Sequence, residues 1–76
     1  MNKEKRKQLN KAIGLLNEAK DIVECVMDEE QYDYDNLTEG LKYTMRGQEM
    51  EEAVGNMESA MDSIDDAIDA IEDASL

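Results

Sequence analysis

Carboxylates are the reactive groups that this sequence supplies in quantity. The chain of 76 residues contains 20 Asp and Glu against 8 Lys and Arg, which gives a formal net charge of −12. It has no His, one Cys and no Pro. Carboxylates can act as general acids and bases, bind metal ions, or present negative charge to a basic partner. Their spacing along the chain decides between these roles.

Metal and catalytic roles lack the residues that they need. A di-metal carboxylate site in a helical bundle uses His beside Glu, and a zinc site uses several His or Cys. The acids around Asp33, Asp35 and Glu39 lack the central Gly and terminal Glu of a twelve-residue calcium loop. Cys25 lies beside Glu24 without a His base, so we interpret it as an unreactive thiol. We expect no enzymatic activity, no metal and no cofactor.

The remaining role is the presentation of charge, and the acids gather in the second half of the chain. Residues 48–76 contain ten acids and no base, whereas residues 1–11 contain five bases. The candidate partner-binding face consists of Glu51, Glu52, Glu58, Asp62, Asp65, Asp66, Asp69, Glu72 and Asp73. A regular row of carboxylates can enter a basic groove that normally holds nucleic acid phosphates. The alternative is an ordinary solvated helix surface.

A seven-residue repeat holds these acids and predicts helices. The second half reads MEEAVGN, MESAMDS, IDDAIDA and IEDASL from residue 50, with position a at the start of each heptad. The first half reads LNKAIGL, LNEAKDI and VECVMDE from residue 9. Positions a, d and e are mostly apolar, and the acids of the second half fall mainly at b, c and f. This spacing is typical of coiled-coil helices.

The expected architecture is all-α: an antiparallel two-helix hairpin with a coiled-coil-like, Ala-rich seam. We expect a single domain over 1–76, with helix 1 near 4–31, a connector containing a short helical turn near 32–44, and helix 2 near 45–74. Similar helix lengths and a compact connector favour the antiparallel arrangement. Thr44 is the expected N-cap of helix 2, and Asn36 or Thr38 that of the short turn.

Two features of the repeat support the hairpin. Six of the seven d positions hold Ala, which allows close approach of two backbones, although Ala is also the best helix former. The basic segment 3–7 and the acidic segment 69–73 each oppose the dipole of their own helix. An antiparallel hairpin places the two segments side by side, where each offsets the other.

The apolar stripe is wider than one seam requires. Leu15 and Ile22 extend it at position g, which favours a homodimer forming a four-helix bundle, or a hairpin docked on a partner. The residues assigned to the core and to self-association are Leu9, Ile13, Leu16, Val23, Met27, Met50, Val54, Met57, Met61, Ile64, Ile68 and Ile71. No apolar run approaches the ~20 residues of a membrane span. No apolar stretch of signal-peptide type follows the basic segment 3–7, so we expect a cytoplasmic protein. The charge repels nucleic acid and anionic membranes, so we expect contact with neither.

The connector and the second helix also resemble known sequences. The segment DNLTEGLKYTMRGQEMEEAVGNMESAMDSIDDAIDAIEDA is similar to a group of small acidic proteins of phages, prophages and mobile elements of Gram-positive gut bacteria. Their pattern is a DN-(L/M/I)-P-E-N-L turn, a Ser cap and acidic heptads. Asp35–Leu41 and Thr44 occupy the matching positions, with Thr38 for the usual Pro and Gly40 for the usual Asn. The group has no assigned activity, so the resemblance implies an origin in a bacterial host cell and no functional residues.

Two hypotheses follow. The first is a non-enzymatic protein-binding module that inhibits a host defence nuclease, of anti-CRISPR or anti-restriction type, through a face that mimics DNA. Its partner is then a basic nucleic-acid-binding host protein. Small acidic phage proteins often oppose host defence, which favours this hypothesis by analogy. The alternative is a structural or accessory coiled-coil protein whose only role is self-association.

Overall fold

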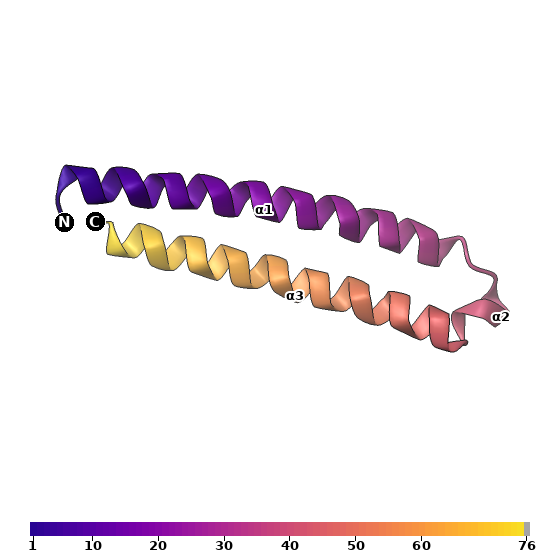
Figure 1. Cartoon of the computed structure of the whole chain (residues 1–76). Coiled ribbons are helices and arrows are strands. Elements are labelled where there is room, and N and C mark those ends of the chain that lie inside the picture. The colour runs from indigo at the N-terminus through magenta and orange to yellow at the C-terminus, as the bar shows by residue number, and fades with distance from the viewer. Residues whose placement is uncertain (76) are drawn as a thin grey trace.

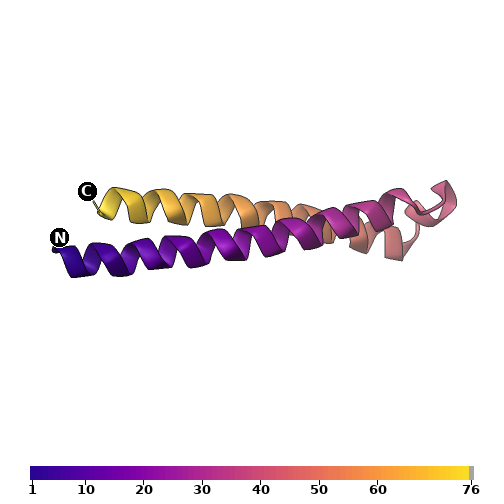
Figure 2. The same cartoon turned by 90° about the horizontal axis from the view of Figure 1, so that it is seen from above.

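The computed structural model describes residues 1–75, and all its regular structure in that range is helical. α1 spans Lys3–Asp35, α2 spans Glu39–Lys42 and α3 spans Met45–Ala74. α1 and α3 lie side by side and antiparallel (Figure 1). Seen from above, they form a rod with α2 at one end, here called the tip (Figure 2). Its Cα extents are 58 × 15 × 12 Å. None of the helices described is both long and apolar enough to cross a lipid bilayer.

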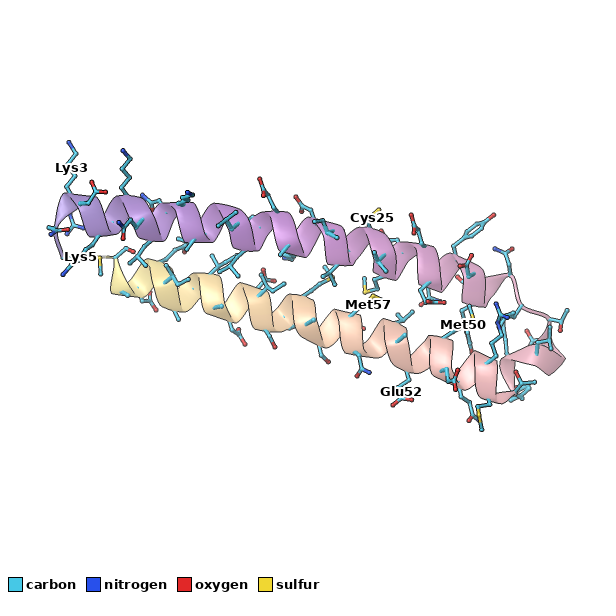
Figure 3. The ribbon with its side chains drawn as sticks, in the orientation of Figure 1. Lys3, Lys5, Cys25, Met50, Glu52 and Met57 are labelled. Carbon is cyan, nitrogen blue, oxygen red and sulfur yellow. The ribbon has the colours of Figure 1, made fainter. Side chains whose placement is uncertain are left out.

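The seam between α1 and α3 uses positions a and e of both helices. All twelve residues assigned to the core lie in it, and eleven of them are half-buried. Met50 is the exception because only 9% of its surface remains exposed. Met50 and Met57 both lie between the two helices (Figure 3). The seam is therefore a single row of apolar contacts rather than an enclosed core.

The alanine column borders this seam, which corrects the expected Ala-rich seam. Three of its members are half-buried and three are exposed: Ala12, Ala53 and Ala67 against Ala19, Ala60 and Ala74. Positions a and e also repeat with alternating spacings of four and three residues, and they hold larger side chains. The helices turn these larger side chains toward each other because that buries more apolar area. Ala at these positions also favours the helix, because it has the highest helix propensity.

α1 continues one turn beyond its expected end at residue 31. Glu30 and Tyr34 maintain the seam spacing, and both are half-buried. The helix ends at Asn36, where the backbone N–H and the side-chain amide both donate to the Tyr32 carbonyl. The Asp residues expected in the connector are consequently helical. Turn-forming residue types did not stop the helix because the seam still offered contacts to this last turn.

Two threonines and one glycine shape the tip. Thr38 accepts a hydrogen bond from the Leu41 N–H at 3.3 Å and caps α2. Thr44 accepts from the Gly47 N–H at 3.5 Å, which confirms it as the N-cap of α3. Gly47 is buried, and a Cβ there would lie 2.8 Å from the Leu41 carbonyl oxygen and closer still to the Lys42 carbonyl. The missing side chain lets α2 fold back onto the first turn of α3.

The basic start of α1 and the acidic end of α3 share one end of the rod, as expected (Figure 1). Within residues 1–75, however, no ion pair joins segments 3–7 and 69–73. Their attraction therefore acts through the longer-range field, which extends about 10 Å at 0.1 M salt.

Candidate functional site: an acidic side and an apolar side

The hairpin has two broad sides, and the heptad positions decide what each side presents. Successive helical residues are about 100° apart, so positions b and f lie on one flank of the a/e seam and positions d and g on the other. An antiparallel pair has approximate two-fold symmetry about the normal to the plane of its helices. Equivalent positions of α1 and α3 therefore share a side. We name the b/f side the acidic side and the d/g side the apolar side.

The acidic side gathers carboxylates from both helices. α3 contributes six of the nine predicted residues: Glu51, Glu58, Asp62, Asp65, Asp69 and Glu72. The other three occupy position c on the outer edge: Glu52, Asp66 and Asp73. Glu52 points away from α1 accordingly (Figure 3).

α1 adds acids that lie outside the predicted face. Asp21, Glu24, Asp28 and Asp35 lie at positions b and f, and all are exposed. The sequence gives the heptad positions of these acids. The antiparallel pairing through the a/e seam places them beside the acids of α3. The candidate face is consequently two helices wide.

Asp65 differs from its neighbours because it holds α1. The Lys20 Nζ donates to both carboxylate oxygens of Asp65, at 2.8 and 2.9 Å. The hydrogen bonds that Lys20 donates to Asp65 are the largest cause that raises the pKa of Lys20 above its usual value of 10.5. Both residues are half-buried. Asp65, expected to be free for a partner, is thus a structural residue of the hairpin.

The other acids of the face keep their charge directed to solvent. They are all exposed, and the second ion pair found in residues 1–75 joins Lys42 to Glu39 at 3.6 Å, near the tip. The Lys42 ammonium also lies 5.4 Å from the centroid of the Tyr34 ring. Within residues 1–75, Lys20 is therefore the only cation in an ion pair with an acid of this side, while Lys3 and Lys7 share the side at the end away from the tip.

The described chain offers no cluster of three His, Cys, Asp or Glu side chains that could hold a metal ion. Cys25 lies on the outer edge of α1, away from α3 (Figure 3). Its thiol is 4.0 Å from the Glu29 carboxylate. The open depression around it is lined by residues of α1 alone: Cys25, Asp28, Glu29, Tyr32 and Asp33. It is a patch of helix surface and not an enclosed site.

The apolar side presents large side chains on α1 and small ones on α3. Leu15, Ile22 and Val26 are 57%, 66% and 46% exposed. With Ala19 they follow the alternating four-three spacing of one helix face. The d and g positions of α3 carry no charge over several turns: Ala53, Asn56, Ala60, Ser63, Ala67, Ala70 and Ala74. The expectation that Leu15 and Ile22 extend beyond the hairpin seam is confirmed.

Comparisons of the chain with protein families, with curated proteins and with solved structures find no match in any of the three.

Proposed function

We propose that the chain is a non-enzymatic protein-binding module whose acidic side occupies the nucleic-acid groove of a basic host protein. The observation that carries this proposal is the density of exposed charge on α3. From Glu51 to Asp73 the helix rises about 33 Å at 1.5 Å per residue and carries eight exposed carboxylates, five on the acidic side and three on its outer edge. This is about one charge per 4 Å, near the spacing of one phosphate per about 3.4 Å along a DNA strand.

The rigidity of the support strengthens the proposal. The carboxylates stand on a helix that is continuous from Met45 to Ala74, and its inner face is fixed against α1. A partner groove therefore meets charges whose positions are already set, which lowers the entropy lost on binding. Complementary charge also speeds the encounter of two proteins.

The resemblance to small acidic phage proteins suggests the class of partner. A host defence nuclease of the CRISPR or restriction type binds DNA in a basic groove, and occupation of that groove would block cleavage. This reading places the protein in the cytoplasm of a bacterial host cell. It requires neither a cofactor nor direct contact with nucleic acid or membrane.

The test is a DNA-cleavage assay over a panel of restriction and CRISPR nucleases. The double variant Asp62→Lys/Asp69→Lys reverses two charges on the acidic side without touching the Lys20–Asp65 pair. We expect this variant to inhibit the sensitive nuclease at least about tenfold more weakly than the wild type. Inhibition by the wild type should also weaken with added salt, because salt screens the attraction between the acidic side and the basic groove.

The matched control is Glu4→Lys/Glu18→Lys, which makes the same change in net charge on the outer edge of α1. It should retain most of the inhibition. Equal losses from both double variants would show that net charge alone matters and would contradict the proposal. Inhibition that survives the Asp62→Lys/Asp69→Lys change would contradict it directly.

A second function is favoured by the exposed residues of the apolar side. We propose that the protein acts as a homodimer in the form of a four-helix bundle. In the alternative to inhibition, this self-association is the whole function, as in a structural or accessory coiled-coil protein. That alternative requires the apolar side alone, so it predicts that reversal of Asp62 and Asp69 has no functional effect.

A further inference from the structure

The hairpin leaves apolar surface uncovered while its own core is thin. Within residues 1–75, Met50 is the only apolar side chain classed as buried. Leu15, Ile22 and Val26 meanwhile face solvent in a row on α1. The a and e residues assigned to self-association are occupied inside the hairpin. A dimer that covers apolar surface therefore uses the apolar side, where Leu15 and Ile22 extend the stripe, rather than the a and e residues assigned to self-association.

The flanks of the exposed row differ in charge, and this points to the occupant. On the apolar side of α1, Lys5 precedes the row, whereas Glu29 and Asp33 follow it. A second α1 placed antiparallel on the first, about the midpoint of Leu15–Val26, sets each basic flank against an acidic flank. The row and its flanks on one α1 therefore match those of an antiparallel second α1, both in apolar side chains and in charge.

Side-chain size along α3 fits the same arrangement. The two-fold axis that pairs α1 with α1 also brings α3 over α3, where both helices present Ala and Ser. Small side chains on one helix pair allow close approach there, while Leu and Ile fill the wider gap between the two α1 helices. The whole uncharged side is then covered at once.

The area available is of the order that a stable dimer needs. A standard interface buries about 800 Å² per partner, about one seventh of the 5722 Å² accessible surface of the hairpin. One broad side of a two-helix rod, uncharged over much of its length, supplies such an area. The acidic sides of both copies face outward, so dimerisation leaves them accessible.

We infer that the apolar side is the docking surface of a second copy of this chain, with α1 stacked antiparallel on α1 and the two tips at opposite ends. This inference deepens the homodimer of the proposed function and rests on it. The first test is the molar mass by multi-angle light scattering over a range of concentrations. We expect twice the chain mass of 8.6 kDa. A monomer at all concentrations up to the millimolar range would overturn the inference.

The second test places a charge on the surface. Ile22→Asp should raise the dissociation constant of the dimer at least about 100-fold, because two buried Ile are lost and two Asp take their place. Cys25→Asp adds the same charge on the outer edge of α1 and should leave the dimer intact. Ile22 is exposed in the hairpin, so helicity by circular dichroism should survive in both variants. A dimer unaffected by Ile22→Asp would overturn the inference.

The third test fixes the orientation. Spin labels on Lys3→Cys, in a Cys25→Ser background, report the distance between copies by double electron–electron resonance. Antiparallel stacking predicts about 50 Å, because residue 3 lies about 17 residues from the midpoint of the row in each copy at 1.5 Å per residue. A short distance would place both tips at one end and overturn the stacking.

The failure of this inference can be told apart from failure of the acidic-side proposal. Ile22→Asp should yield monomers that still carry an intact acidic side, and their inhibition per hairpin can be measured. Asp62→Lys/Asp69→Lys should leave the mass of the dimer unchanged while inhibition falls. Loss of the dimer in this second variant would overturn the assignment of the two roles to opposite sides.

Discussion

Gly47 is the position where one methyl group should matter most. A Cβ there would collide with the backbone of α2 rather than with a movable side chain. Gly47→Ala should therefore lower the free energy of unfolding by about 1–3 kcal/mol, the usual cost of overpacking. Gly55→Ala is the matched control, since a Cβ at Gly55 meets nothing within 4 Å and Ala favours a helix by up to about 1 kcal/mol. Urea denaturation followed by circular dichroism measures both.

Equal stability of Gly47→Ala and the wild type would mean that α2 does not pack against α3. The sequence predicted the cap at Thr44 because a cap depends on residues within one turn. It did not distinguish Gly47 from Gly55 because the carbonyls that crowd Gly47 belong to a different helix. Local signals could be read from the chain, whereas this contact depends on how the tip folds back.

At the scale of elements, the two long helices followed from the heptads, but their facing surfaces did not. In α1 the a/e row and the row Leu15, Ala19, Ile22 and Val26 share the same four-three spacing. Periodicity alone cannot choose between two rows with one period. The choice is made by the summed apolar area on both helices. Because of the same ambiguity, the heptads alone do not place the acids of α1 on the candidate face.

Lys20 is a cation inside the seam, and its pair with Asp65 ties α1 to α3. Because folding raises the pKa of Lys20, the charged amine stabilises the fold below its unfolded pKa. That stabilisation disappears as the pH rises through the higher folded value. The free energy of unfolding of the wild type should thus fall relative to Lys20→Met from about pH 9 to about pH 12, a range around the usual Lys pKa of 10.5.

Lys11→Met is the control for this pH series because Lys11 is exposed on the outer edge of α1. It should follow the wild type more closely than Lys20→Met does. A constant difference between the wild type and Lys20→Met across the series would contradict a role for the pair. Thermal or urea unfolding at each pH supplies the free energies.

For the whole molecule, the net charge of −12 opposes the compact state. Repulsion between exposed carboxylates is screened over about 3 Å at 1 M salt and over about 30 Å at 0.01 M. The melting temperature should therefore rise between these concentrations of NaCl. The variant Asp62→Lys/Asp69→Lys gains two charge units at each site and should show a smaller rise. A melting temperature that falls with salt would indicate that attraction between the rod's ends dominates.

The joining of the two long helices at one end only also orders the events of folding (Figure 1). Contacts near the tip, around Met50, close short loops, while those around Leu9 and Ile71 span most of the chain. Each helical turn added from the tip extends an existing contact between α1 and α3. The hairpin therefore forms from the tip outward, and its far end unfolds first. Amide hydrogens should consequently exchange slowest near Met50 and progressively faster toward Leu9, which gives a gradient of local stability along the rod.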